Sequence, residues 1–507
     1  MKTRIILLFI IILFFASRLY RISDIPPSVY WDEASIGYNA YSVGIDGKDE
    51  WGSFLPLHFR AFGEFKLPIY IYSVVPFVKM FGLNSVAVRL PSVMYSFGLV
   101  LVTYFLVRKI TKNELVSVFS AFYIVVTPWL FIFSRSGYEA TAGLMFYLLG
   151  VYFLVKSTEN IKWYIAGVVG FIISIYSYNS FRILSPISLF VLSACVFYVH
   201  KKILKKALPV MALMLILFAI STIPIVRLYL YDAGGIRLQA VGLTGTGVQK
   251  VVQVGYNYLL NFSPSYLFSS GDTNLRSQMP GFGQLYWLSL PLILLGTFSI
   301  FRNKKIAYYL LLAGLIMSPL PAVLTKENPH ALRSITSIFF YAIISGLGLQ
   351  LLTEKYSKGK TAITVGVAIL FLLFFSVYLV KFFTNYSVLS SKDWQYGYKE
   401  IYTHYKSDFL KNREVYISDE YAQPYIFTLF YQQVDPELFR ETSVLNSVDK
   451  WGQSKISRIG QEYKYDLKDA DGKENVIIFA SEKEKFIDRI PIGEIKFLDG
   501  STAFFVY

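Results

Sequence analysis

Cysteine is almost absent from the sequence, which contains only Cys195. A single cysteine excludes an intrachain disulfide and any metal site built from several cysteines. The glycine patterns of nucleotide-binding loops and the P-loop are also missing, so we do not expect the chain itself to use ATP. The sequence therefore points away from a disulfide scaffold, a cysteine metal centre and a nucleotide-driven machine.

Charged residues are scarce as well, at 16% of the chain, whereas 54% of the residues are hydrophobic and the mean hydropathy is +0.46. A soluble domain carries more charge than this, so the composition predicts an integral membrane protein with the lipid bilayer as a partner. The net charge of +15 would suggest nucleic acid in a soluble protein. Here lysine and arginine gather in short loops between apolar runs, as membrane orientation requires, and we expect no nucleic-acid partner.

Apolar runs of spanning length recur over the first three quarters of the chain. A hydrocarbon core of ~30 Å needs about 20 mostly apolar residues in a helix. The sequence predicts about eleven such helices, at residues 4–19, 89–108, 115–133, 139–156, 161–178, 182–200, 207–228, 283–301, 305–324, 331–352 and 361–383. Residues 67–82 are apolar but short and contain Pro68 and Pro76, which favours a helix lying in the membrane interface.

The basic residues fix the expected orientation. If 67–82 does not span, the loops on the side of the N-terminus contain Lys2, Arg4, Arg108, Lys109, Lys112, Lys156, Lys162, Lys201, Lys202, Lys205, Lys206, Arg302, Lys304, Lys305, Lys355, Lys358 and Lys360. The short loops opposite hold only Arg135, Arg182, Lys326 and Arg333. This asymmetry predicts a multi-pass protein of the plasma (inner) membrane with a cytoplasmic N-terminus.

Three segments are then expected outside: residues 20–88, residues 229–282, and everything from about residue 385. The tail 385–507 carries more charge and short β-rich runs at 414–419, 475–481 and 501–507. A helical stretch at 394–405 adds an apolar face. The predicted organisation is a polytopic α-helical membrane domain, residues 1–384, followed by a small α/β domain outside the membrane, residues 385–507.

Unusual polar residues concentrate on the predicted outer side. They are Asp32, Glu33, Glu64 and Lys66 in the first outer loop, and Arg135, Glu139, Arg182, Lys326, Glu327, His330 and Arg333 in the short outer loops. Ionisable groups near a bilayer are costly unless they are paired or face a wet cavity, so their convergence predicts a shared polar site. The alternative for each cation taken singly is that its side chain reaches to lipid head groups.

The mixture of signs suits a reaction at an anionic lipid head group. Guanidinium and ammonium groups would hold a phosphate and neutralise its charge as it leaves, and a carboxylate would take the proton from an attacking hydroxyl. The alternative for Asp32 and Glu33 is that they are first-turn carboxylates of a helix formed by the residues that follow them. The two interpretations are compatible, because a carboxylate at a helix start can also face a cavity.

The order of motifs resembles a known family. W-D-E at 31–33, G-E-F-K-L-P-I-Y-I-Y at 63–72, F-G at 81–82 and R-L-P-S at 89–92 follow the first helix. This arrangement is similar to the membrane-embedded GT-C glycosyltransferases of the protein O-mannosyltransferase and aminoarabinose lipid A transferase type. The resemblance implies a GT-C fold over residues 1–384 and transfer of a sugar from a polyprenyl-phosphate donor to an acceptor protein, lipid or glycan on the outer face.

The same resemblance implies roles for individual residues. Asp32 would position or deprotonate the acceptor hydroxyl, with Glu33 as its acidic neighbour. Lys66 would contact the carrier phosphate, and Tyr70 follows it in the motif.

Further residues take roles at the donor phosphate or the substrate cavity. Arg135 with Glu139 resembles the arginine and acidic residue where helices three and four meet outside. We also expect Arg182, His330 and Arg333 at the donor phosphate, and Glu64, Tyr70 and Glu139 around the substrate cavity. The sequence departs from the family's Glu-Lys-Pro-Pro, which leaves open whether Glu64 holds a divalent metal ion.

Two other function classes compete with this interpretation. A polysaccharide polymerase or ligase would use an arginine-rich outer loop, for which 229–282 offers only Arg237 and Arg276. A flippase for lipid-linked sugars would need polar residues through the membrane thickness. The middles of the predicted spans are nearly pure apolar instead, as at 362–380. The sequence thus favours chemistry at the interface over transport.

Overall fold

The computed structural model describes residues 2–62, 64–200, 204–231, 241–405, 410, 413–448, 454–486 and 489–507. Outside this description lie several positions used above: Lys201, Lys202 and Arg237, and the side chains of Lys2, Glu64, Lys205 and Lys206. The chain forms two compact units, which are described separately. The helical unit contains Met1–Tyr20, Ser92–Leu230 and Val241–Lys381, and the loop-and-sheet unit contains Arg21–Pro91, Tyr231–Ala240 and Phe382–Tyr507.

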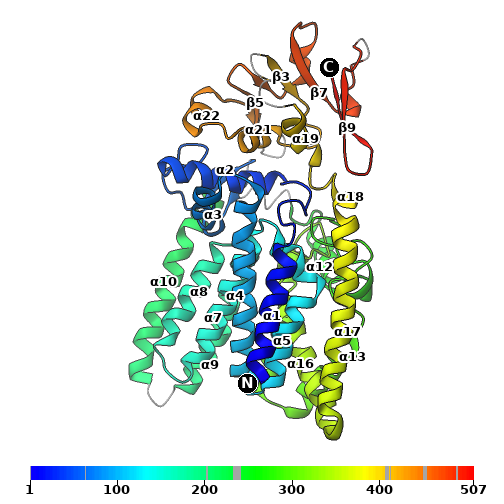
Figure 1. Ribbon diagram of the computed structural model, residues 1–507. Coiled ribbons are helices and arrows are strands. Elements are labelled where there is room, and N and C mark those ends of the chain that lie inside the picture. The colour runs from blue at the N-terminus through cyan, green and yellow to red at the C-terminus, as the bar shows by residue number, and fades with distance from the viewer. Residues whose placement is uncertain are drawn as a thin grey trace. The chain divides into compact units, whose positions relative to one another are not determined.

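Helices of different lengths, most of them apolar, make up the helical unit (Figure 1). They are α1 (Lys2–Leu19), α4 (Ser85–Thr111, in this unit from Ser92), α5 (Glu114–Val126), α6 (Pro128–Phe131), α7 (Glu139–Ser157), α8 (Trp163–Ile175), α9 (Phe181–Val199), α10 (Leu204–Tyr231), α12 (Gly247–Leu260), α13 (Ser289–Asn303), α14 (Ile306–Met317), α15 (Leu320–Val323), α16 (Ser337–Lys355) and α17 (Lys360–Lys381). Short turns of other helix types stand at Phe133–Arg135, Ser265–Ser269 and Ser357–Gly359.

Among the residues that the structure describes, seven helical segments are long and apolar enough to cross a bilayer. They are Ser85–Thr111, Glu139–Ser157, Phe181–Val199, Ala207–Leu230, Ile306–Val323, Ser337–Lys355 and Ser357–Ser390. An eighth span results if Glu114–Val126 and Pro128–Arg135, which are bent by 62°, cross together. The chain is therefore an integral membrane protein, as the composition predicts.

Each of the eleven predicted spans overlaps a helix, but not every helix has spanning length. The helices α8 and α13 contain only 13 and 15 residues. The 18 residues of α1 include three basic side chains. Residues 68–81 form α3, a helix of 14 residues that is too short to span on its own, as expected of 67–82. The total of eleven spans stays a prediction.

Glycines let two helix pairs of this unit approach closely. A Cβ on Gly296 of α13 would stand 1.8 Å from the carbonyl oxygen of Ile344, and one on Gly348 of α16 would stand 2.0 Å from that of Leu292. Between α7 and α8, a Cβ on Gly170 would come within 2.8 Å of the nitrogen of Gly150. Small residues at such crossings allow the van der Waals packing that holds helices together in lipid. The helices α7, α8 and α9 consequently lie side by side (Figure 1).

The segment from Arg21 to Phe81 opens the loop-and-sheet unit. It forms α2 (Trp31–Asp46), an antiparallel hairpin of β1 (Phe59–Ala61) and β2 (Glu64–Lys66), and α3 (Pro68–Phe81). Asp32 and Glu33 occupy the first turn of α2, which ends at Gly47 with a φ of 79°. Carboxylates at a helix start and a left-handed glycine at its end stabilise helix boundaries, so the local sequence accounts for the limits of α2.

The C-terminal part of this unit is a mixed α/β structure. Its helices are α18 (Ser387–Ser390), α19 (Tyr396–His404), α21 (Pro424–Gln432) and α22 (Pro436–Thr442), with turns of other helix types at Phe382–Tyr386, Leu467–Ala470 and Glu482–Glu484. Its strands are β3 (Glu414–Ile417), β4 (Val444–Val448), β5 (Ser454–Ile459), β6 (Tyr463–Lys464), β7 (Val476–Ala480), β8 (Gly493–Lys496) and β9 (Thr502–Val506).

These strands form one sheet in the order β4-β5-β6-β3-β7-β9-β8. Its centre is parallel, because β3 pairs in parallel with β6 and with β7, and the outer pairs are antiparallel. The three runs predicted as strands are β3, β7 and β9, which lie next to one another in the sheet. The expected α/β character of the tail is confirmed.

Helix α2 and the C-terminal part of this unit pack against each other. The helix α2 packs against α21, where the hydroxyl of Tyr38 donates to the carbonyl oxygen of Val434 at 3.1 Å. A Cβ on Gly37 would stand only 2.7 Å from the ring of Phe430. The middle of α2 is thus held in place by residues about 400 positions later in the chain.

Candidate functional site

Asp32 and Lys66 meet in the loop-and-sheet unit. Asp32 lies in the first turn of α2 and Lys66 ends β2, and the Lys66 ammonium donates to the Asp32 carboxylate. The Lys66 side chain is only 3% exposed, whereas that of Asp32 is 29% exposed. The ring of Phe62 lies beneath the ammonium, with its centre 5.8 Å from Nζ. This pair combines a partly exposed carboxylate with a buried cation, and the predicted catalytic and phosphate-binding roles of the two residues stay predictions.

Glu33 occupies a different environment although it is the next residue. Its carboxylate accepts hydrogen bonds from Nε and Nη2 of Arg89 at 3.1 and 3.0 Å, and both side chains are fully buried. The remaining donors of Arg89 reach the carbonyl oxygens of Ile22, Pro26 and Ser28 at 2.6 to 3.0 Å. The geometry favours a structural role for Glu33, and its predicted catalytic role stays a prediction.

Arg89 is a residue that the sequence analysis missed as a site component. It stands in the R-L-P-S motif that opens the second predicted span. A charged residue near the start of such an apolar helix indicates a buried partner or a functional role. All its guanidinium protons are used in the structure, on Glu33 and on the chain segment that leads into α2. Arg89 therefore fixes the position of the first turn of α2 and, through it, of Asp32.

Tyr70 and Glu64 were expected around the substrate cavity. The Tyr70 side chain is fully buried and its hydroxyl donates to the carbonyl oxygen of Val88 at 2.9 Å, so it ties α3 to α4. The side chain of Glu64 lies outside the described residues. Among the residues that are described, no three acidic, histidine or cysteine side chains cluster as metal ligands would. The cavity roles of Tyr70 and Glu64 stay predictions.

Glu50, in the same loop, is a buried acid that carries no signal in the sequence for its burial. It is fully buried, and burial together with the neighbouring Asp49 raises the pKa of its carboxyl from 4.5 to about 8. Burial also raises the pKa of Asp49. A carboxyl with such a pKa is protonated at neutral pH. Glu50 is therefore an uncharged residue in the core formed by α2 and the hairpin.

Replacing Glu50 by Gln should remove a pH dependence of stability. Because the folded pKa of about 8 exceeds the unfolded value of 4.5, the folded state holds the proton more tightly and loses stability as pH rises between these values. The total loss is about 5 kcal/mol at ~1.4 kcal/mol per pH unit. Thermal unfolding should be measured for both purified proteins at pH 5 and pH 9. The unfolding midpoint of the Gln variant, relative to that of the natural protein, should be higher at pH 9 than at pH 5. An equal difference between the two midpoints at both pH values would contradict the raised pKa of Glu50.

Arg135, in the helical unit, holds the end of α1. Its Nη1 donates to the carbonyl oxygens of Ser17 and Arg18 at 2.7 and 2.6 Å, and its Nη2 donates to that of Tyr20 at 2.8 Å. A guanidinium at the carboxyl end of a helix satisfies free carbonyls and complements the helix dipole. The structure thus gives Arg135 a structural role, and binding of donor phosphate by it stays a prediction.

Glu139 and Arg182 stand at the starts of α7 and α9. Glu139 lies in the first turn of α7 and is half-buried. Nη1 of Arg182 donates to the hydroxyl of Tyr229 at 2.8 Å, and the guanidinium lies 5.4 Å from the centre of that ring. These contacts position Arg182 without assigning it a ligand, so its phosphate role also stays a prediction.

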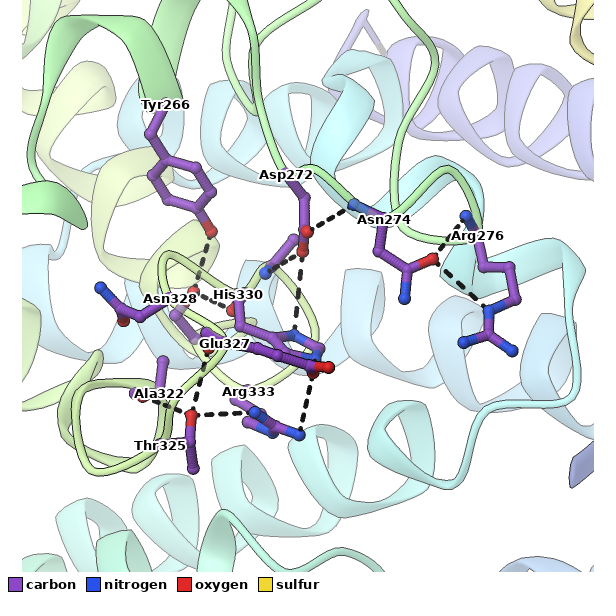
Figure 2. Close-up of polar contacts among 12 residues, drawn as sticks. Tyr266, Asp272, Asn274, Arg276, Ala322, Thr325, Glu327, Asn328, His330 and Arg333 are labelled. Carbon is purple, nitrogen blue, oxygen red and sulfur yellow. Dashed lines mark hydrogen bonds and ion pairs between the residues drawn. The ribbon is translucent and has the colours of Figure 1, made fainter. Parts of the chain in front are cut away.

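His330 and Arg333 belong to a polar network in the helical unit (Figure 2). Nδ1 of His330 lies 3.8 Å from the carboxylate of Asp272, and Nε2 lies 3.9 Å from that of Glu327. Nη2 of Arg333 lies 3.6 Å from the Glu327 carboxylate, and Nη1 donates to the hydroxyl of Thr325 at 2.8 Å. The two predicted cations are brought together here, with an exposed carboxylate, Glu327, between them.

Asp272 anchors this network and was not predicted. Its carboxylate accepts from the backbone nitrogens of Ala331 at 2.6 Å and Asn274 at 2.9 Å, so it joins the second outer loop to the segment before α16 (Figure 2). Burial raises the pKa of its carboxyl, while these two backbone donors and Arg333 oppose the rise. A lone acid in a polar loop carries no sequence signal for such a long-range contact.

A small cavity lies in the loop-and-sheet unit beside the start of α2. It has a volume of about 160 Å³ and is lined by Ser23, Ser28, Val29, Leu83, Asn84, Ser85, Lys399, Phe430 and Tyr431. The Lys399 ammonium donates to the carbonyl oxygen of Pro27 at 3.0 Å, and burial and then Arg89 lower its pKa. Its lining mixes polar and apolar side chains, and neither Asp32 nor Lys66 is part of it.

Comparison with known proteins gives three relevant similarities. The profile of the dolichyl-phosphate-mannose-protein mannosyltransferase family matches residues 67–225. ArnT from Cupriavidus metallidurans has a similar structure in its apo state, with a TM-score of 0.55 and 11% identity, over 94% of this chain and 92% of ArnT. The undecaprenyl-phosphate-bound ArnT gives the same TM-score and identity, over 94% and 93%.

A third solved structure is more distant. The apo oligosaccharyltransferase of Archaeoglobus fulgidus has a TM-score of 0.50 and 12% identity, over 85% of this chain, which spans only 64% of the length of that enzyme. Comparison with curated proteins gave no match. The similarity to ArnT extends over nearly the whole of both chains. The chain therefore has the GT-C fold, and its resemblance to the membrane glycosyltransferases of that superfamily is confirmed.

Proposed function

We propose that this protein transfers a sugar from a polyprenyl-phosphate donor to an acceptor hydroxyl on the outer face of the membrane. The observation that carries the proposal is the Asp32–Lys66 pair, a partly exposed carboxylate beside a buried ammonium at the start of α2. The match to a mannosyltransferase family and the binding of undecaprenyl phosphate by ArnT, which shares the fold, support a lipid-phosphate donor.

The pair supplies the two functions that such a transfer needs. The acceptor hydroxyl gives its proton to the Asp32 carboxylate while its oxygen bonds to the anomeric carbon of the donor. The bond between that carbon and the phosphate oxygen breaks, and its electron pair remains on the phosphate. Lys66 would then stabilise the charge on the leaving phosphate.

The ion pair also explains how the two charges of the site would be neutralised when no donor is bound. In the structure Lys66 neutralises Asp32, so neither charge is left alone in a partly buried place. An arriving phosphate would compete for Lys66 and free the carboxylate to accept a proton. The predicted binding of donor phosphate by His330 and Arg333 stays a separate proposal, supported by their place in one polar network of the helical unit (Figure 2).

The function is tested with purified protein in detergent. We expect incubation with polyprenyl-phosphate-linked sugars and candidate acceptors to release polyprenyl phosphate and to add one sugar mass to an acceptor, detected by mass spectrometry. Movement of intact donor across proteoliposomes with no product would instead favour a flippase.

Replacing Lys66 by Ala should weaken donor binding. Loss of a buried charge-assisted contact to phosphate costs about 1.5–3 kcal/mol, or roughly 10- to 150-fold in affinity. The measurement is the dissociation constant of undecaprenyl phosphate for the purified protein. The control is Lys79→Ala, which removes an exposed lysine from α3 in the same loop and tests simple attraction to head groups. Equal affinities of the two variants would exclude the phosphate role of Lys66.

A further inference from the structure

A second cavity lies within the helical unit. It has a volume of about 290 Å³ and is bounded by residues of α4, α7, α9, α14 and α16. Aliphatic and aromatic side chains make up most of its lining, among them Val155, Leu192, Leu310 and Phe340. We call it the interhelical cleft.

The cleft presents almost pure hydrocarbon to its occupant. Of the residues that line it, only Lys109, Tyr147 and Ser188 carry polar side-chain atoms. The hydroxyls of Tyr147 and Ser188 bond to each other at 2.7 Å, so their polarity is satisfied within the wall. A ligand rich in hydrogen-bonding groups would lose its water there without replacement, which leaves a hydrocarbon chain as the fitting ligand.

The length of the cleft corresponds to one leaflet of a bilayer. Its residues on α14 run from Ala307 to Met317, which is ~15 Å along a helix that rises ~1.5 Å per residue. Half of a hydrocarbon core of ~30 Å has the same depth. A chain that enters at one end of the cleft therefore fills it without crossing the whole membrane.

One end of the cleft is basic. Lys109 lies there near the end of α4, and its ammonium pairs with the Glu159 carboxylate. Lys109, Lys112 and Lys156 together lower the pKa of Glu159, which shows that three lysines surround this single acid. The end of the cleft thus has an excess of positive charge, and basic residues next to a membrane attract anionic lipids by about fivefold per lysine.

We propose that the interhelical cleft binds one acyl chain of an anionic phospholipid, with the head group at Lys109. The phospholipid belongs to the leaflet on the basic side of the protein. The isoprenoid tail of the sugar donor is the rival occupant. Lys109 is 24 residues along α4 from Ser85, the first residue of that helix. The segment that contains Lys66 leads into Ser85, so a donor phosphate at Lys66 would start from the other end of α4.

Native mass spectrometry of the full chain in detergent tests the proposal, with phosphatidylglycerol and phosphatidylcholine as probes. Wild-type protein should retain one phosphatidylglycerol in preference to phosphatidylcholine. Ala313→Leu, which fills the cleft from α14, should weaken phosphatidylglycerol binding about tenfold or more by overpacking. Lys109→Ala should instead reduce the preference for the anionic lipid about fivefold.

The controls separate a filled site from a misfolded protein. Ala362→Leu makes the same change at an exposed position of α17 and should bind phosphatidylglycerol like wild type. Ala307→Leu fills the cleft at its basic end and repeats the test if Ala313→Leu does not fold. Equal binding by the cleft and control variants would overturn the site. Displacement of phosphatidylglycerol by an equimolar amount of undecaprenyl phosphate would overturn the choice of occupant. Neither outcome depends on sugar transfer.

Discussion

Asp32→Asn is expected to lower the rate of sugar transfer by about 10²–10⁴-fold, the usual contribution of a general base. Asparagine keeps the size of the side chain but cannot accept the proton of the acceptor hydroxyl at neutral pH. Donor affinity should stay the same or increase, because Lys66 loses the carboxylate that competes with phosphate for it. The readouts are kcat with a working donor and acceptor, and the dissociation constant of undecaprenyl phosphate.

The same helix provides a matched control for this variant. Asp46, in the last turn of α2, also has a 29% exposed side chain and pairs with a cation, Arg440. Asp46→Asn removes an equivalent ion pair at the opposite end of α2 and should leave transfer unchanged. If Asp32→Asn retained full activity, or if both variants lost activity equally, Asp32 could not be the base.

Arg89→Ala should produce the largest loss of stability, about 3–5 kcal/mol, as expected when one partner of a buried ion pair is removed. Glu33 would be left as an uncompensated buried charge, and the carbonyl oxygens of Ile22, Pro26 and Ser28 would lose their donor. Thermal unfolding of the purified protein should show a much lower midpoint, and limited proteolysis should cut the segment before α2.

Two further variants define what Arg89 contributes. Arg89→Lys keeps the charge but not the five donors in a planar arrangement, so we expect it to recover little of the lost stability. Arg440→Ala removes an arginine whose ion pair is partly exposed and should cost much less, about 1 kcal/mol or less. An Arg89→Ala protein that melts like wild type would show that the buried pair does not hold α2 in place.

The membrane character of the chain and the main elements of its tail follow from the amino-acid sequence alone. Apolar runs longer than a bilayer needs can only be satisfied as helices in lipid, and alternation of β-branched and aromatic residues predicts β3, β7 and β9 directly. It also placed Asp32 and Glu33 in the first turn of a helix, which the structure confirms. These features depend on residues close together in the chain.

The contact that each polar side chain makes depends on the three-dimensional packing of the chain. Neighbours in a helix point about 100° apart, so Asp32 reaches Lys66 on the hairpin while Glu33 turns into the core to meet Arg89, 56 residues away. Arg135 binds carbonyl oxygens at the end of α1, more than 100 residues earlier in the chain, and its own neighbours in the sequence do not indicate this contact. The sequence shows which residue types are present, but the direction of each side chain depends on the packing of segments far apart in the chain.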